Sequence, residues 1–441
     1  MKIKVLKFGG TSVATVEARA AAAQRVFDAR QAGFAPIAVV SAIGRKGAPY
    51  ATDTLIGEYR SVNPQLEPQA RELDLIMACG EIISAVIFAQ TCRSLGLRAT
   101  ALTGAQAGLE TDGRYGNARV CGVNAKRILS LLEEGCTPVI CGFQGASEED
   151  RSEITTLGRG GTDTTAAAIG AAVRACAVEI FTDVDGIKTA DPDAVPNAPT
   201  LRKVSYEEVA ELAHLGAKVL HPRSAEIAMR HAIPLWVKNS FSGDEGTEIV
   251  DEDVSYEHEL TGITHSGKLV YLRFDLTDIL ADRRSEFERR LFSLLAQFDI
   301  GLYMLNLSPA GIGFAVERLQ FPSAERLLDG LLIPSENEPV ILQLGSPSQK
   351  VQAQQTLLGG KARPVRVEIT EGCTMISVVG RSYFGRPGVF YSILSILNED
   401  KVQVFQTADS DFSVSFLIPE TETHRAVRVL HDRLVVTPKI K

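Results

Sequence analysis

The sequence lacks the patterns that mark disulfide frameworks, metal sites and membrane spans. Its seven cysteines are scattered without a CxxC pair, which favours reduced thiols over disulfides or a zinc site. The seven histidines show no HExxH or related ligand spacing, so we predict no metal-ligand set. No signal-peptide pattern and no uninterrupted apolar run long enough to cross a bilayer are present, so we expect a cytoplasmic protein that does not bind a membrane.

Basic residues do not outnumber acidic ones. The chain has 46 Lys and Arg against 54 Asp and Glu, a formal net charge of −8. Without a basic stripe to follow a phosphate backbone, a nucleic-acid partner is not expected. Apolar residues are plentiful, at 45% of 441 residues, which is enough for two or three domains with hydrophobic cores.

A glycine pair near the N-terminus follows a short apolar run. Lys7 ends the run, Gly9 and Gly10 follow, and an alanine-rich helical pattern begins after Ser12. Glycines let backbone N–H groups approach an anion closely, and a helix N-terminus favours negative charge, so we predict a phosphate cradle. The spacing does not match GxxxxGK[ST], because the lysine precedes the glycines, and a plain strand-to-helix turn stays open as an alternative.

A second glycine pair precedes another alanine-rich helix within residues 155–173. Arg159, Gly160, Gly161, Thr162 and Asp163 place a guanidinium, a hydroxyl and a carboxylate at the helix start. Two such turns in one domain favour an anion site over ordinary loops.

These segments resemble the amino-acid kinase family, and the fuller set of motifs resembles the aspartate kinases. The resemblance is dense over roughly the first 245 residues and looser beyond them. The matching segments are KFGGTSV (7–13), VVSAIGRKGAPYATDTL (39–55), CGEIISA (79–85), GFQGA (142–146), LGRGGTDTTAAA (157–168), FTDVDGI (181–187), TADP (189–192) and GAKVLHP (216–222).

The pattern of strand-like and helical segments changes near Gly243. Before it, strand-like apolar runs alternate with helical stretches, which predicts an α/β domain over 1–245 with a mostly parallel sheet between helices. After it, two weakly repeated strand–helix–strand patterns predict small α+β units over 260–335 and 370–436. The second resembles an ACT domain, a ferredoxin-like unit, through the turn at 385–388, which the first lacks. Residues 320–364 fit neither unit clearly.

The resemblance implies an enzyme that transfers the γ-phosphoryl group of ATP, as its Mg²⁺ complex, to the β-carboxylate of L-aspartate. The product, 4-phospho-L-aspartate, leads towards diaminopimelate, lysine, threonine and methionine. Because phosphoryl transfer asks the protein mainly for positive charge and positioning, cations and glycine turns are the expected tools.

The resemblance also implies roles for individual residues. Lys7 and Lys218 are the expected catalytic cations, and Asp163 holds the lysines in register or helps order Mg²⁺. Arg159 is expected to bind the α-carboxylate of aspartate and Glu81 its α-ammonium, with Thr52 and Thr162 nearby. The expected ATP contacts are Lys7, Phe8, Gly9, Gly10, Ser41, Thr182, Asp183, Gly186, Lys188, Asp191 and Lys218.

Two positions depart from the family pattern on the nucleotide side. The family usually has an aromatic residue after TDVDGI and an arginine after ADP, whereas this chain has Lys188 and Asp193. ATP is still expected there, with adenine and ribose contacts the least defined.

Regulation is expected in the C-terminal half. A polar cluster in the second unit is a candidate effector site, with an ordinary turn as an equal alternative. Lysine, threonine and diaminopimelate are the candidate effectors, and pairing of ACT units implies a homo-oligomer. The cluster comprises Gln406, Thr407, Ala408, Asp409 and Ser410.

Two rival functions fit parts of the sequence. Another amino-acid or carbamate kinase is disfavoured, because those enzymes lack this C-terminal half and the YATD and CGE segments. A non-catalytic amino-acid sensor or regulatory subunit built on ACT units is disfavoured by the intact set of Lys7, Arg159 and Asp163.

Overall fold

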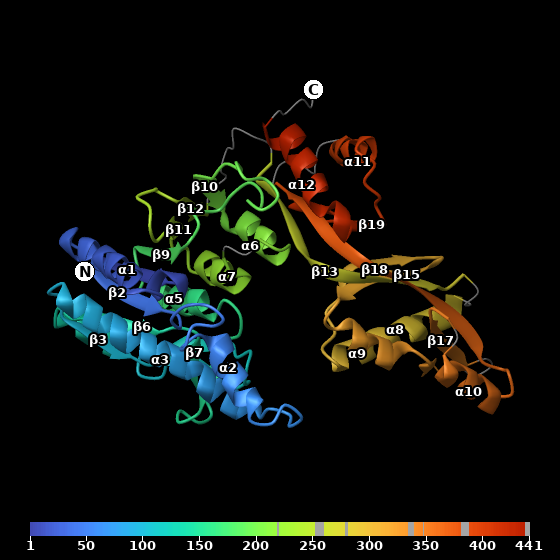
Figure 1. Ribbon diagram of the computed structural model, residues 1–441, viewed down its shortest axis with the longest axis horizontal. Coiled ribbons are helices and arrows are strands. Elements are labelled where there is room, and N and C mark those ends of the chain that lie inside the picture. Colours follow the sequence, from blue (N-terminus) through green and yellow to red (C-terminus); the bar gives the residue numbers. More distant parts are fainter. Residues whose placement is uncertain are drawn as a thin grey trace. The chain divides into compact units, whose positions relative to one another are not determined.

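The computed structural model describes residues 1–217, 220–251, 260–277, 281–333, 339–346, 348–380 and 388–436. The chain divides into two compact units, coloured by sequence in Figure 1. The first comprises Met1–Thr189 and Ala198–Glu257, and the second comprises Ala190–Asn197 and His258–Lys441.

The first unit is built on an eight-stranded sheet. Its strands β11, β9, β1, β2, β6 and β3 are parallel neighbours, and β12 runs antiparallel to β11. The central strands are buried along almost their whole length, as expected of a parallel sheet covered on both faces. The strand order is β10 (Lys203–Ser205), β12 (Thr247–Val250), β11 (Leu235–Asn239), β9 (Ala177–Thr182), β1 (Ile3–Phe8), β2 (Ala35–Val40), β6 (Thr137–Cys141) and β3 (Ala99–Leu102).

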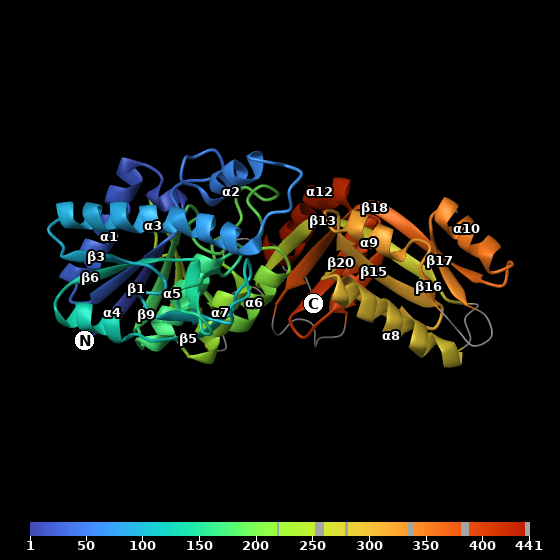
Figure 2. The ribbon, with the colours of Figure 1, turned by 90° about the horizontal axis from the view of Figure 1, so that it is seen from below.

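Helices cover both faces of this sheet, which confirms the predicted α/β architecture. Figure 2 shows α1 (Val16–Gln31) and α3 (Ala70–Ser94) on one side of the strands and α5 (Gly161–Ala172) on the other. Phe8 of β1 packs between Phe88 of α3 and Phe181 of β9, with ring centroids 5.3 and 5.1 Å away. This aromatic contact fixes the end of β1 at which the first glycine turn begins.

Helix α3 is apolar enough, by length and composition, to cross a membrane, although a core helix passes the same test. Glu81 lies within it, so its apolar run is interrupted. Its residues Ala85 and Phe88 are fully buried in the core of the first unit.

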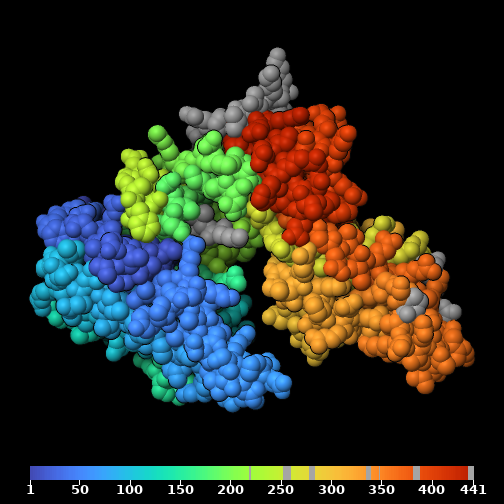
Figure 3. Space-filling model, viewed as in Figure 1, coloured from blue at the N-terminus to red at the C-terminus, as the bar shows by residue number. Residues whose placement is uncertain are grey.

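Smaller elements complete the first unit. A four-stranded sheet has the order β5, β4, β7, β8. Helix α2 and the segment after it are largely exposed, in the lighter blue of Figure 3. The bounds are β4 (Leu109–Thr111), β5 (Val120–Val123), β7 (Gln144–Ser147), β8 (Ile154–Thr156), α2 (Thr52–Ser61), α4 (Lys126–Glu133), α6 (Tyr206–His214) and α7 (Pro222–Arg230).

The second unit is organised by two long antiparallel strands, β13 (Gly262–Asp275) and β18 (Arg363–Val379). The main sheet has the strand order β14, β15, β13, β18, β17, β16. The C-terminal part of β18 also pairs with β20, and β20 pairs with β19. The remaining bounds are β14 (Tyr303–Ser308), β15 (Gly311–Glu317), β16 (Leu332–Ile333), β17 (Val340–Leu344), β19 (Gln406–Asp409), β20 (Ser413–Pro419), α8 (Ala281–Gln297), α9 (Phe321–Leu328), α10 (Gln349–Leu357), α11 (Val389–Glu399) and α12 (Thr423–His431).

The shared strands explain why residues 320–364 fitted neither predicted unit. They form α9, β16, β17 and α10, and β17 pairs with the first half of β18. The sequence suggested two successive units, whereas β13 and β18 run through both halves of one sheet system. The boundaries 1–245, 260–335 and 370–436 stay predictions, and the turn residues 381–387 lie outside the described residues.

Candidate active site

A cavity of about 680 Å³ opens in the first unit beside the carboxyl ends of β1 and β2. Ligands of parallel α/β sheets bind at this edge, because the loops that leave the strands converge there. The cavity brings together eight residues that the sequence predicted from four separate segments: Lys7, Gly10, Ser41, Thr52, Glu81, Arg159, Thr162 and Asp163.

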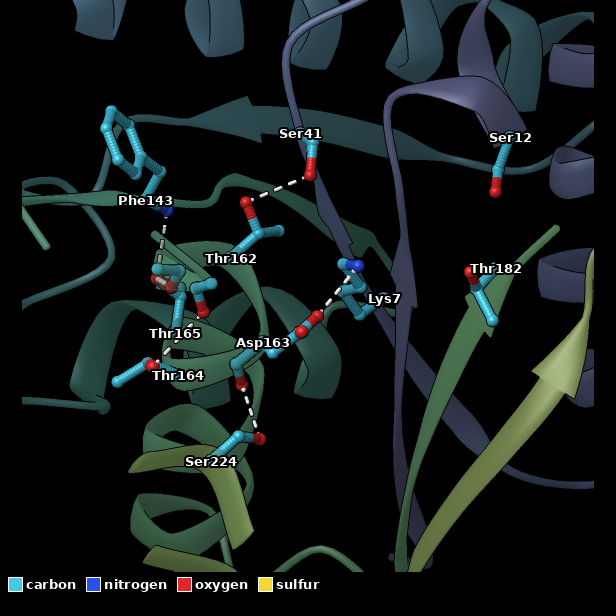
Figure 4. A network of polar contacts seen from close by, with 12 residues as sticks. Lys7, Ser12, Ser41, Phe143, Thr162, Asp163, Thr164, Thr165, Thr182 and Ser224 are labelled. Carbon is cyan, nitrogen blue, oxygen red and sulfur yellow. Dashed lines mark hydrogen bonds and ion pairs between the residues drawn. The ribbon is translucent and has the colours of Figure 1, made fainter. Parts of the chain in front are cut away.

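An ion pair between Lys7 and Asp163 lies in the wall of this cavity. Lys7 Nζ is 2.7 Å from Asp163 Oδ1, and the two residues are only 9% and 8% exposed. Lys7 comes from β1, Asp163 from the first turn of α5, and the Ser224 hydroxyl of α7 donates to the Asp163 carbonyl at 3.1 Å (Figure 4). The ammonium is therefore held at a defined point of the cavity.

Both glycine turns need glycine for close backbone approach. A Cβ at Gly10 would lie 2.5 Å from the Gly44 carbonyl oxygen, and the Gly44 N–H donates to the Gly10 carbonyl at 3.0 Å. Gly160 has φ +67°, and a Cβ there would lie 2.3 Å from the His221 side chain. The Ser41 hydroxyl donates to Thr162 Oγ1 at 2.9 Å and thereby links the β2 loop to the second turn (Figure 4).

Glu81 is a buried carboxyl group on the α3 side of the cavity. It is 2% exposed, and its Oε1 accepts a hydrogen bond from the Ala42 N–H at 3.0 Å. Its Oε2 accepts no hydrogen bond from the part of the chain that the structure describes. Burial raises the pKa of Glu81 to about 8. The group is therefore protonated at neutral pH without a ligand, and an arriving cation would favour its ionised form.

Arg159 presents an exposed guanidinium at the cavity. Within the described ranges it makes no hydrogen bond or ion pair, so its donors are available to a ligand. Thr52 begins α2, and both it and Thr162 border the same space. A guanidinium and a buried carboxyl group that line one cavity suit a small molecule that carries both a carboxylate and an ammonium.

Phe8 and Gly9, which were predicted to contact ATP, use some of their groups in contacts within the protein. The Phe8 side chain is fully buried, and its carbonyl accepts from the Ser41 N–H at 3.1 Å. The Gly9 N–H donates to the Phe181 carbonyl at 3.3 Å, so it is already engaged. Gly10 and Lys7 are the cradle residues that line the cavity.

The predicted nucleotide residues follow β9, the strand beside β1. The Thr182 hydroxyl donates to Asp183 Oδ1 at 3.2 Å, and Asp183 Oδ2 lies 2.6 Å from Arg45 Nη2. Gly186 has φ +141°, and Lys188 Nζ donates to the Ala198 carbonyl at 3.3 Å.

Two further residues predicted to contact the nucleotide do not lie among the described residues of the first unit. Asp191 belongs to the second unit, where its side chain accepts from the Asp193 N–H at 2.9 Å. Lys218 lies outside the described residues.

The first residue of the candidate effector cluster, Gln406, makes hydrogen bonds within the protein through both ends of its side-chain amide. Gln406 is 8% exposed; its Oε1 accepts from the Tyr271 hydroxyl at 2.8 Å, and its Nε2 donates to the Met304 carbonyl at 3.2 Å. Thr407, Ala408 and Asp409 continue β19, and Asp409 is exposed. A ligand at this cluster would meet Asp409 more readily than Gln406.

Asp74 was missed by sequence reasoning although it shapes the rim of the cavity. It is fully buried and accepts hydrogen bonds from the Gly116 N–H at 2.9 Å and from the Thr156 N–H at 2.7 Å. Desolvation raises the pKa of Asp74, against the opposing effect of these donors. Its spacing of two helical turns from Glu81 was the available signal, because both residues share one face of α3.

The described residues contain no group of three or more His, Cys, Asp or Glu side chains that could hold a metal ion. A divalent cation at this site would therefore rely on oxygen atoms from its ligand as well as from the protein.

Comparisons with known proteins agree along the whole chain. The model of the amino acid kinase family matches residues 2–239, and an ACT domain model matches residues 368–432. Aspartokinase 1 of Bacillus subtilis (strain 168) is 36% identical over 438 residues, which cover 98% of each chain.

Solved structures match the fold. The crystal structure of E. coli aspartokinase III in complex with aspartate and ADP (R-state) has a TM-score of 0.73 at 24% identity and covers 98% of this chain and 99% of that chain. The same enzyme in complex with lysine and aspartate (T-state) has a TM-score of 0.68 at 24% identity with the same coverage. The predicted combination of an α/β kinase domain and ACT-type α+β structure is confirmed as the fold class.

Proposed function

The chain belongs to the amino acid kinase family and, within it, to the aspartokinases, and from this premise we propose how its cavity performs the reaction. The protein is an ATP-dependent aspartate kinase that phosphorylates the side-chain carboxylate of L-aspartate. The products are ADP and 4-phospho-L-aspartate. The family assignment made from the sequence is confirmed by the 36% identity to an aspartokinase over 98% of the chain.

The observation that carries the assignment of roles is the buried pair of Lys7 and Asp163, 2.7 Å apart in the cavity wall. The transferring phosphoryl group carries charge on its peripheral oxygens, and a cation fixed in place before the reaction stabilises that charge without reorganising. Lys7 is the cation in this proposal. Asp163 holds it in position, and Gly10 lets the loop after β2 lie against the turn that carries the proposed phosphate cradle.

Aspartate binds on the other side of the same cavity in this proposal. The Arg159 guanidinium forms two parallel hydrogen bonds to the α-carboxylate, and Glu81 pairs with the α-ammonium. Thr52 and Thr162 contribute hydroxyls to the substrate. This arrangement is supported by the free guanidinium of Arg159 and by the unused oxygen of Glu81 within the described residues.

Magnesium accompanies ATP in this proposal. Asp163 would help hold it together with phosphate oxygens and water, since Mg²⁺ usually keeps several of its waters. The cation neutralises phosphate charge when it is bound. The nucleotide itself would meet Ser41, Thr182, Asp183, Gly186 and Lys188 of the first unit, while contacts from Asp191 and Lys218 stay predictions from the sequence.

Feedback regulation through the second unit is part of the proposal. The ACT domain match covers residues 406–410, which include β19. An amino acid bound there can regulate turnover only by favouring one arrangement of the kinase over another, and pairing of ACT units in a homo-oligomer supplies such arrangements. Lysine, threonine and diaminopimelate are the candidates; the E. coli relative has been solved with lysine.

The test of the function is an ADP-release assay with Mg²⁺ and ATP, run with and without L-aspartate. We expect ADP release that depends on aspartate, together with an acyl phosphate that hydroxylamine traps as the hydroxamate. L-Glutamate, which is one methylene longer, serves as the matched control substrate. ADP release at the same rate with and without aspartate would contradict the proposal.

A further inference from the structure

Arg45 lines the cavity but has no role among those assigned above. It follows β2, and its Nη2 lies 2.6 Å from Oδ2 of Asp183, which follows β9. In the sheet, β1 lies between β2 and β9. An ion pair that joins the loops after β2 and β9 must therefore pass over the carboxyl end of β1, where Lys7 and Gly10 form the cradle.

The backbone beside Arg45 is anchored on that cradle. The Gly44 N–H donates to the Gly10 carbonyl at 3.0 Å, and the Ala42 N–H donates to Glu81 at 3.0 Å. These two bonds hold the loop against the first glycine turn and against α3. Arg45 itself lines the cavity together with Lys7 and Thr52.

The bond between Arg45 and Asp183 is easily exchanged. The Arg45 side chain is 73% exposed and that of Asp183 38% exposed. Exposed ion pairs contribute little net stability, because water and salt screen both charges. A phosphate group offers the guanidinium a stronger partner, with two parallel charge-assisted hydrogen bonds. Phosphates that enter the cradle would also be repelled by the Asp183 carboxylate for as long as it faces them.

We propose that Arg45 exchanges Asp183 for the γ-phosphate of ATP and acts as a further catalytic cation in addition to Lys7. The inference rests on the proposed kinase function and deepens it. The γ-phosphate is assigned because Arg45 lines the same cavity as Thr52 and Glu81, which are proposed for aspartate, and is paired with Asp183, which is proposed for the nucleotide. The γ-phosphate is the part of the nucleotide that must reach aspartate in the reaction.

The test compares two nucleotides that differ at the γ position. Binding of ADP and of AMP-PNP, an analogue with an imido bridge, is measured by calorimetry with Mg²⁺ on the full-length chain. We expect Arg45→Gln to weaken AMP-PNP about tenfold or more and ADP less than about threefold. Turnover should fall on the order of thirtyfold, because the contact strengthens as charge develops on the phosphoryl group.

Two further variants sharpen the result. Arg45→Lys keeps the charge and loses the planar fork, so its turnover should lie between that of the wild type and that of Arg45→Gln. Arg290→Gln is the matched control: Arg290 Nη2 also lies 2.6 Å from a carboxylate, Glu286 Oε1, and both side chains are partly exposed on helix α8 of the second unit. It should change neither nucleotide affinity nor turnover. The unfolding temperature checks that each variant is folded.

The outcomes separate this inference from the function itself. Equal weakening of ADP and AMP-PNP by Arg45→Gln would overturn the γ-phosphate contact, and so would unchanged AMP-PNP affinity with normal turnover. A wild-type chain that releases no ADP in response to aspartate would instead contradict the proposed function, whatever Arg45 does.

Discussion

Glu81 in the cavity of the first unit and Gln406 beside the long strands of the second unit are both buried polar side chains, but their hydrogen bonding differs. In the cavity, Glu81 keeps one oxygen without a hydrogen bond from any described residue. In the second unit, both ends of the Gln406 amide are used, by Tyr271 of β13 and by Met304 of β14. Because an unsatisfied buried polar group costs stability, its presence indicates a place kept for a ligand, whereas a satisfied one fixes packing.

The largest expected effect is at the centre of the cavity. Lys7→Ala should lower turnover by about a hundredfold or more, because it removes the proposed cation at the transferring phosphoryl group. Steady-state ADP release measures the effect. Lys4→Ala is the matched control on the same strand, since Lys4 pairs with Glu179 at 3.1 Å and does not line the cavity. Normal turnover in folded Lys7→Ala would contradict the proposal that Lys7 stabilises the transferring phosphoryl group.

The next effect tests the unused oxygen of Glu81. Glu81→Gln should raise the KM for aspartate by about thirtyfold, because a hydrogen-bonded charge contact to the ammonium is lost. Glu179→Gln is a suitable control: that buried glutamate is already paired with Lys4 and Lys238, at 3.1 and 2.9 Å. If the KM of Glu81→Gln stays at the wild-type value, the α-ammonium of aspartate does not bind Glu81.

The same carboxyl group predicts a pH dependence with a defined sign. Its pKa is raised from 4.5 to about 8 in the folded protein. The unfolded chain therefore loses this proton first, and the stability due to protonated Glu81 falls as the pH rises from about 4.5 to 8. Aspartate needs the ionised form, so its KM should fall over the upper part of this range. Both trends should flatten in Glu81→Gln, as thermal unfolding and kinetics from pH 6 to 9 would reveal.

A smaller effect is expected at the exposed side of the cavity. Arg159→Lys keeps the positive charge and loses the bidentate geometry, so aspartate affinity should fall about tenfold. The affinity for ATP should change little. Separate titrations of the two substrates measure this, and an equal loss for both would count against a contact with the aspartate carboxylate.

The satisfied network of the second unit should affect stability and leave turnover alone. Tyr271→Phe removes the donor to Gln406 Oε1 and should cost about 1 to 3 kcal/mol of unfolding free energy. Turnover without an effector should stay within about twofold of the wild type, since no substrate contact is lost. Chemical denaturation and ADP release on the same preparation test both parts, and a large loss of turnover would break the contrast between the two regions.

The smallest effect on turnover is expected at Asp409. It is exposed on the strand whose first residue, Gln406, is buried. Asp409→Ala should relieve inhibition by whichever of lysine, threonine or diaminopimelate is active, with uninhibited turnover nearly unchanged. Inhibition titrations on both proteins, with light scattering for oligomer size, provide the measurement. A strictly monomeric enzyme that is still inhibited would show that the ACT pairing model is wrong.

Much of the fold was predictable because it follows local patterns. Apolar runs that end in glycine pairs, followed by alanine-rich helices, predicted β1 with its turn and the start of α5. The spacing of motifs predicted which strand ends carry polar residues. Residues 320–364 escaped prediction because β16 and β17 are short and complete a sheet whose long strands lie on either side of them in the chain.

By itself, the sequence determined the family, the order of the elements and the residue types at the strand ends, since these depend on spacing along the chain. Tertiary structure decided which charges are paired and which are not. The pairing of Lys7 with Asp163, the desolvation of Glu81, the role of Asp74 at the rim and the reach of Arg45 across β1 all join residues from separate segments. Burial and electrostatic interaction depend on distance in space, and only folding brings these groups within reach of one another.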